Sequence, residues 1–141
     1  MPPSVELPLT GGCGCGAVRF EISAPLVAAA YCHCTRCQRR TGTATQASAK
    51  IEPESFALTQ GREHLGAWVL EDGLEKVFCC ECGSALFART QEDHEVTIVR
   101  LGAIDGDPGV RPQARQFVAY AAPWEPIPDD GLPRFDERIP T

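Results

Sequence analysis

The sequence predicts a mainly β fold, formed by one domain that spans residues 1–141. Its 13 glycines and 12 prolines favour many tight turns, and short segments carry apolar residues at alternate positions, as half-buried strands do. A chain of this length buries roughly two-thirds of its surface on folding, which is enough for a core without disulfides. We expect the core at about residues 9–122, and a proline-rich tail at residues 123–141 that lies extended across the domain.

The composition argues against several classes of protein. The formal net charge is −6 and the basic residues are thinly spread, so nucleic acid is not an expected partner. No apolar run approaches the ~18 residues of a membrane span, and residues 1–10 lack the regions of a signal peptide. We therefore expect a cytoplasmic protein without membrane contact. In a reducing compartment, eight cysteines favour metal binding or catalysis over disulfides.

The N-terminal part begins with a glycine-rich approach at residues 9–16, where Cys13 and Cys15 flank a bend. Residues 17–22 then alternate between apolar and charged side chains, which predicts the first strand. Residues 27–31 predict a second short strand, and it leads directly into a cluster of cysteines.

This cluster contains Cys32, Cys34 and Cys37, with the spacing Cys-x-Cys-x-x-Cys. Three cysteines within six residues form a tight turn that can aim three sulfur atoms at one point. Residues 35–40 predict a short helical turn that Thr35 caps.

The middle of the chain predicts successive antiparallel strands. Residues 44–51 form a strand with small side chains, which either packs closely against another sheet or walls a pocket. The Glu-Asp-Gly sequence at residues 71–73 is typical of a hairpin turn. The other expected strands are residues 56–58, 65–70, 75–78, 84–89, 95–101 and 117–120.

Two cysteine pairs that lie far apart in the sequence predict a structural metal site. Cys79 and Cys82 have the Cys-x-x-Cys-Gly form of a zinc knuckle, and the economical pairing joins them to Cys13 and Cys15. Four thiolates complete the tetrahedral coordination of structural zinc. Such a site would tie the first strand to a central hairpin, and its binding energy would be folding energy.

The three cysteines of the tight turn predict a second zinc ion, so that each chain would bind two. If the turn begins extended, His33 points away from both neighbouring sulfur atoms and packs beside the site rather than binding metal. Cys80 is either a spare thiol or the fourth ligand, which would make this site closed and structural.

An open second site has a definite chemical use. Zinc with three thiolates is a soft Lewis acid that suits the binding of a substrate sulfur as thiolate. The three cysteines of this site would then be the catalytic groups, acting through the metal on a small thiol or thiol adduct. The neighbouring Arg36, Arg39 and Arg40 either meet substrate carboxylates or face the solvent.

Four motifs with specific spacing extend over nearly the whole chain. They are Gly12-Cys13-x-Cys15-Gly16-Ala17-Val18-x-Phe20, then Cys32-His33-Cys34-x-x-Cys37-x-x-x-Thr41-Gly42, then Phe78-Cys79-x-x-Cys82-Gly83-Ser84-x-Leu86-Phe87, and finally Ala122-Pro123-Trp124 with Asp130-Gly131-Leu132-Pro133-x-Phe135. Together these motifs resemble the glutathione-dependent formaldehyde-activating enzyme family, which also includes centromere protein V.

The resemblance implies a beta-tent fold of antiparallel sheets, stapled by zinc. It also implies carbon–sulfur chemistry, in which formaldehyde condenses with glutathione to S-(hydroxymethyl)glutathione or such adducts are cleaved. The chain departs from the family at Arg115, because family members commonly carry a histidine in that segment. The ligands that the resemblance implies are Cys13, Cys15, Cys79 and Cys82 for a structural zinc, and Cys32, Cys34 and Cys37 for the second zinc.

Two functions of different class are consistent with the sequence. The first is a zinc-dependent carbon–sulfur lyase that acts on a small thiol adduct, with glutathione as the expected thiol. The second is a non-enzymatic zinc-binding module with two structural metal sites, which binds a partner through its sheet surface or its tail.

Overall fold

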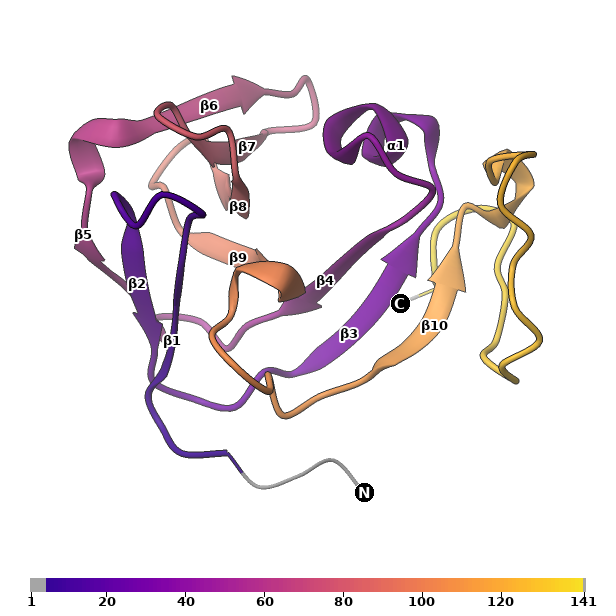
Figure 1. Cartoon of the computed structure of the whole chain (residues 1–141), viewed down its shortest axis with the longest axis horizontal. Coiled ribbons are helices and arrows are strands. Elements are labelled where there is room, and N and C mark those ends of the chain that lie inside the picture. Colours follow the sequence, from indigo (N-terminus) through magenta and orange to yellow (C-terminus); the bar gives the residue numbers. More distant parts are fainter. Residues whose placement is uncertain (1–4, 141) are drawn as a thin grey trace.

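The computed structural model describes residues 5–140 and contains two β-sheets, one short α-helix and three turns of 3-10 helix (Figure 1). The mainly β fold predicted from the sequence is confirmed. Within the described residues, no helix has the length and apolar character that crossing a bilayer requires. The helical elements are α1 (Thr35–Thr41), η1 (Arg62–His64), η2 (Leu101–Ala103) and η3 (Val118–Tyr120).

The smaller sheet has three antiparallel strands in the order β1–β2–β5. They are β1 (Leu9–Gly12), β2 (Arg19–Ile22) and β5 (Phe56–Gln60). The larger sheet has seven strands and curves around the molecule from β10 to β6 (Figure 1). Its strands, in spatial order, are β10 (Pro112–Gln116), β3 (Ala28–Cys32), β4 (Gln46–Lys50), β9 (Val96–Arg100), β8 (Ala85–Thr90), β7 (Leu74–Cys79) and β6 (Leu65–Val69).

The core lies between the two sheets. Side chains that are paired across neighbouring strands point to the same face of a sheet, so the register of the large sheet defines its core face. The rings of Phe20 and Phe56, from the small sheet, and Phe87, from the large sheet, form an aromatic cluster with centroid separations of 4.7–6.4 Å. The paired residues on the core face of the large sheet are Ala29, Ala49, Val99, Phe87 and Val77, and all five are buried.

The first strand begins earlier than the sequence predicts. Residues 9–12, expected to be an approach to the first strand, form β1 and pair with β2. Glycine is required here, because a Cβ added at Gly11 would lie 2.4 Å from the carbonyl oxygen of Ala103. Because two of its four residues are glycines, β1 lacks the alternation of apolar residues that predicts a strand.

The strands predicted at residues 56–58 and 65–70 are β5 and β6, but they belong to different sheets. The chain changes sheet at Gly61, whose φ of 91° is accessible to glycine at little cost. The hairpin predicted at residues 71–73 is confirmed, because it joins the paired strands β6 and β7 and Gly73 also has a positive φ.

The last strand differs from the predicted one. Residues 117–120 do not form a strand, because Phe117 adopts a left-handed conformation with a φ of 57° and η3 follows. The strand is β10, which precedes them and pairs in parallel with β3, whereas the other strand pairings of the described chain are antiparallel.

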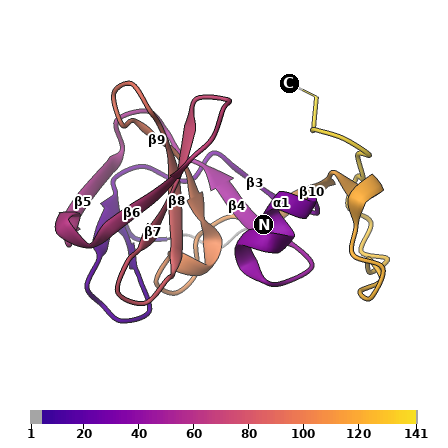
Figure 2. The same cartoon turned by 90° about the horizontal axis from the view of Figure 1, so that it is seen from above.

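The segment after η3 lies beside β10, at the edge of the large sheet that is remote from the small sheet (Figures 1 and 2). The backbone N–H of Arg115 donates to the carbonyl oxygen of Pro133, and the N–H of Phe135 donates to the carbonyl oxygen of Arg115. These bonds hold the proline-rich tail along β10 rather than across the domain.

Candidate functional site

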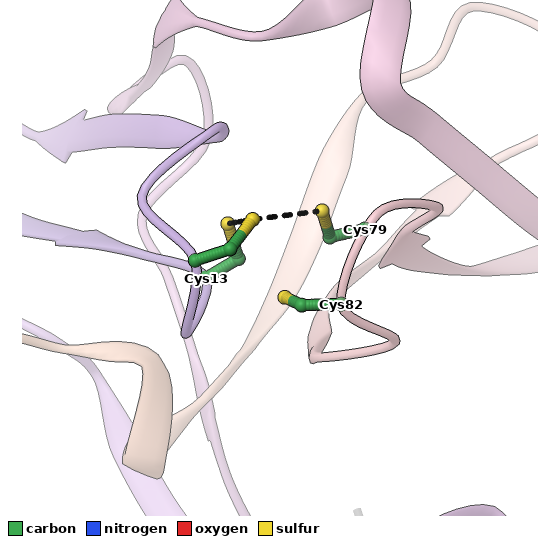
Figure 3. A group of neighbouring side chains, drawn as sticks. Cys13, Cys79 and Cys82 are labelled. Carbon is green, nitrogen blue, oxygen red and sulfur yellow. Dashed lines mark hydrogen bonds between the residues drawn. The ribbon is translucent and has the colours of Figure 1, made fainter.

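The two cysteine pairs predicted to share a metal lie together between the two sheets. The loop between β1 and β2 faces the turn after β7, so that their sulfur atoms point toward one another (Figure 3). All four sulfur atoms lie within 4.8 Å of one another. The sulfur of Cys15 is 3.6 Å from that of Cys13 and 3.9 Å from that of Cys79. A tetrahedron with metal–sulfur bonds of about 2.3 Å has edges of about 3.8 Å, so this group fits a zinc ion. We call Cys13, Cys15, Cys79 and Cys82 the four-cysteine group.

Local backbone geometry places these sulfur atoms. The N–H of Cys13 donates to the carbonyl oxygen of Val18, which closes the loop between β1 and β2. In the second loop, the N–H of Cys79 donates to the carbonyl oxygen of Ser84, and the N–H of Gly83 donates back to the carbonyl oxygen of Cys79. Gly83 has a φ of 80°, as the tight exit of a knuckle requires.

Hydrogen bonds favour the thiolates of Cys13 and Cys82. The N–H of Ala17 favours the thiolate of Cys15, but the neighbouring Cys13 raises the pKa of that thiol to about 12. Ser84 lowers the pKa of Cys82 to about 5, because its hydroxyl and backbone stabilise the thiolate. Burial opposes ionisation of Cys13, but the N–H of Val18 and the neighbouring Cys15 lower its pKa. Metal ligands must be deprotonated, so these contacts suit metal binding.

The three cysteines of the tight turn also come together. Cys32 ends β3, Cys34 precedes α1 and Cys37 lies in the first turn of that helix, and their sulfur atoms lie within 4.8 Å of one another. We call them the three-cysteine group. The helix is confirmed, but its cap is Cys34 rather than Thr35, because the sulfur of Cys34 accepts the N–H of Cys37 at 3.2 Å.

Protons are unequally shared in the three-cysteine group. A hydrogen bond from Cys37 lowers the pKa of Cys32 to about 6, so this thiol ionises first. The neighbouring Cys32 raises the pKa of Cys37 in turn. The side-chain amide of Gln46 also donates to the sulfur of Cys37 at 3.4 Å, and this contact orients the buried sulfur.

Neither His33 nor Cys80 joins the three-cysteine group. His33 is 3% exposed, and its Nε2 accepts from Arg115 at 3.2 Å, on the side of the strand away from the sulfur atoms. Cys80 is exposed, and a Cβ built on Gly66 would lie 2.7 Å from its sulfur, so its side chain turns toward β6. Of the two alternatives for Cys80, this geometry favours a thiol that is not a ligand of the second site.

The arginines of α1 have different environments. Arg36 and Arg39 are exposed. Arg40 is half-buried, with its guanidinium 5.5 Å from the centroid of the Phe78 ring. The helix therefore contacts both β4 and β7, and it covers the face of the large sheet that is opposite the core.

Two buried cations near the three-cysteine group are not predicted from the sequence. Lys76 is 8% exposed and Arg100 is 6% exposed, and both lie under α1 on the face opposite the core. Burial lowers the pKa of Arg100 to about 10, and burial followed by the charge of Arg100 lowers the pKa of Lys76. The alternation of side chains along β7 and β9 predicts only that Lys76 and Arg100 face away from the core. Charged residues at such positions typically face the solvent.

Arg115 links the tail to the strand that carries the cysteines. Its guanidinium donates to the Asp130 carboxylate at 2.7 Å and lies 4.4 Å from the centroid of the Tyr31 ring. It contacts Tyr31 and His33, which flank Cys32 in an extended segment and so point to the opposite face. Arg115 therefore positions the tail and His33, and it does not face the sulfur atoms.

We predict that Asp130→Asn lowers the melting temperature at pH 7, because it removes the carboxylate partner of a buried guanidinium. Arg115 holds the pKa of Asp130 below its usual value. The stabilisation is then fully present above the unfolded pKa of about 3.9 and is lost as the pH falls through the lower folded pKa. Melting curves at pH 7 and pH 3 should show the difference from wild type shrinking at pH 3. Asp129→Asn, at the exposed neighbour, is the matched control, and equal melting of both variants at pH 7 would contradict this role.

We also predict that Gly12→Ala disrupts the four-cysteine group, whereas Gly14→Ala does not. A Cβ at Gly12 would lie 2.2 Å from the carbonyl oxygen of Val18, so the loop backbone must move. A Cβ at Gly14 would meet Ser84 Oγ at 3.4 Å, which is an ordinary contact. Zinc analysis of both purified variants checks this, and full zinc content in Gly12→Ala would show that the loop tolerates the shift.

Comparisons with known proteins agree with the fold. The family model described as "Glutathione-dependent formaldehyde-activating enzyme" matches residues 8–120. A protein of Halomonas elongata, provisionally named a glutathione-dependent formaldehyde-activating enzyme, is 32% identical over 105 residues, which cover 70% of this chain and 67% of the relative. The crystal structure of a Rhodobacter sphaeroides protein shares the fold, with a TM-score of 0.55 and 23% identity over 89% of this chain and 98% of the other. Since the family match contains every cysteine of the two groups, the chain belongs to the glutathione-dependent formaldehyde-activating enzyme family.

Proposed function

We propose that this protein is a zinc-dependent carbon–sulfur lyase that interconverts formaldehyde and glutathione with S-(hydroxymethyl)glutathione. The observation that carries the proposal is the three-cysteine group, in which no fourth Cys, His, Asp or Glu of residues 5–140 joins the three sulfur atoms. Zinc is four-coordinate in proteins, so three protein ligands are typical of a catalytic site with a position for substrate. Family membership supports the choice of glutathione and formaldehyde as substrates.

The residues of the three-cysteine group suit this role. Cys32, Cys34 and Cys37 would hold the metal, and a zinc ion bound there would supply a soft Lewis acid that favours thiolate ligands. The contact of Gln46 with Cys37 fixes one sulfur, and the cap contact fixes the sulfur of Cys34. Two of the three sulfur atoms are therefore oriented by contacts within the protein, as the positioning of a catalytic group requires.

The reaction itself is a reversible addition without oxidation. A bond forms between the glutathione sulfur and the formaldehyde carbon as the π bond of the carbonyl breaks, and the proton of the broken S–H bond moves to the carbonyl oxygen, which becomes the hydroxyl. Burial and the charge of Arg115 lower the pKa of His33, so this imidazole is neutral and serves to pack the strand. Because the cysteines must stay reduced, we place the reaction in the cytoplasm.

The four-cysteine group has a structural role in this proposal. It joins a loop of the small sheet to a loop of the large sheet, so a metal ion bound there would stabilise the fold. The alternative function, a non-enzymatic module with two structural metal sites, requires the three-cysteine group to serve stability in the same way.

We predict two zinc ions per wild-type chain, and different effects of losing each of them. Structural zinc contributes about 10 kcal/mol or more to folding, which is comparable to the whole stability of a small protein. Cys82→Ser should therefore unfold, whereas Cys34→Ser should retain one zinc ion and melt within a few degrees of wild type. Elemental analysis and thermal melts give both values. If Cys34→Ser unfolds as readily as Cys82→Ser, the non-enzymatic alternative is favoured.

We further predict that the zinc-loaded protein accelerates the exchange between glutathione and its hydroxymethyl adduct at least about tenfold over buffer, which corresponds to about 1.4 kcal/mol of barrier lowering. Exchange NMR in glutathione and formaldehyde measures this rate. Cys34→Ser should lose the acceleration, while Cys80→Ser is the matched control and should keep it, because Cys80 lies outside both groups. Equal rates for wild type and Cys34→Ser would reject the proposed reaction.

A further inference from the structure

Two buried cations and a half-buried one lie beside the three-cysteine group. They are Arg40 from α1, Lys76 from β7 and Arg100 from β9, and we call them the cationic cluster. Lys76 and Arg100 share one face of the large sheet with Cys32, the last residue of β3. The register places on this face Cys32, Gln46, Ser48, Arg100, Ala88 and Lys76.

Two contacts measure how close the cluster is to the sulfur atoms. Gln46 and Ser48 are two residues apart on β4, so their side chains emerge from the same face about 7 Å apart. The first contacts the sulfur of Cys37 at 3.4 Å, and the second accepts a hydrogen bond from Arg100 Nη1 at 2.7 Å. Arg100 and Cys37 thus contact neighbouring side chains on one face of β4, which places the guanidinium beside the group that would hold the substrate sulfur.

The cluster presents donors that the described protein does not satisfy. Nε and Nη2 of Arg100, and the same two atoms of Arg40, are buried and have no hydrogen-bond partner among the described residues. No carboxylate of residues 5–140 lies within ion-pair distance of Arg40, Lys76 or Arg100. Buried charges in proteins are normally paired, so unpaired guanidinium groups at this depth indicate an anionic ligand.

The thiolates alone do not account for three cations. Three thiolates around a divalent ion carry one net negative charge, so Arg40, Lys76 and Arg100 exceed it by two positive charges. The excess is local, because the whole chain has a formal charge of −6. Ser48, Ala88 and Ile98 lie on the same face and bring no negative charge to it.

We infer that the cationic cluster is an anion-binding subsite that receives a carboxylate of the thiol substrate while its sulfur lies at the three-cysteine group. This deepens the proposed function, on which it rests for the identity of the ligand as a thiol. The substrate class is then a carboxylate-bearing thiol, such as glutathione, rather than a neutral thiol. Lys76 and Arg100 are binding residues that determine specificity.

The test compares ligands that differ in charge, by calorimetric titration of the zinc-loaded protein. Wild type should bind glutathione about tenfold to a hundredfold more tightly than glutathione diethyl ester, in which both carboxylates are masked, because charge-assisted hydrogen bonds have this strength. This comparison of the two ligands uses the wild-type protein alone. General electrostatic attraction would act in the opposite direction, because the diester is cationic and the protein has a net charge of −6.

Variants then assign the preference to the cluster. Lys76→Met and Arg100→Gln should each reduce the preference for glutathione about tenfold and leave two zinc ions per chain. Lys50→Met removes an exposed lysine from β4 and should retain the wild-type preference. Equal binding of both ligands by wild type, or loss of zinc with equal weakening of both ligands in Lys76→Met, would overturn the inference.

The inference and the proposed function can fail separately. If exchange with formaldehyde is accelerated but both ligands bind equally, the reaction stands and the subsite is wrong. If binding depends on charge as stated but exchange is not accelerated, the subsite stands and the reaction is wrong.

Discussion

Four sulfur atoms, two from the loop after β1 and two from the end of β7 and the turn after it, lie within 4.8 Å of one another where the small sheet meets the large one. The hydrophobic cluster behind this contact is continuous with it, since Val18 closes the first loop and Phe87 follows the second. The same contact fixes the end of β7, and Lys76 lies three residues before Cys79 on that strand. The strand that brings two sulfur atoms to the contact between the sheets thus also carries a buried cation of the candidate site.

The two faces of the large sheet carry different kinds of side chain. One face carries apolar side chains and forms the core with the small sheet. The other carries a cysteine, an amide and two cations, and α1 covers it. Because side chains alternate along every strand, the sequence between Glu75 and Cys79 contributes to both faces at once. A substitution in β7 is therefore expected to change stability if its side chain faces the core, and the candidate site if its side chain faces α1.

Local patterns of sequence predict local structure well in this protein. The alternation at residues 17–22 and the turn at residues 71–73 depend only on neighbouring residues, and both predictions are confirmed. The parallel pairing of β10 with β3 joins segments about 80 residues apart and leaves no periodic signal. Lys76 and Arg100 are missed for a related reason, since a charge that faces away from the core is normally solvated, and only the tertiary position of α1 makes them buried.

The environment of Arg115 supports this division of the sheet. Arg115 is buried, but its partners are Asp130 in the tail and the side chains on either side of Cys32, which point away from the sulfur atoms. It therefore adds no charge to the substrate side of β3. The positive charge on that side comes instead from Arg100 on the central strand β9 and from Lys76 on β7, next to the edge strand β6. The inferred specificity for an anionic thiol thus depends on strands β7 and β9 and not on β10, which carries Arg115.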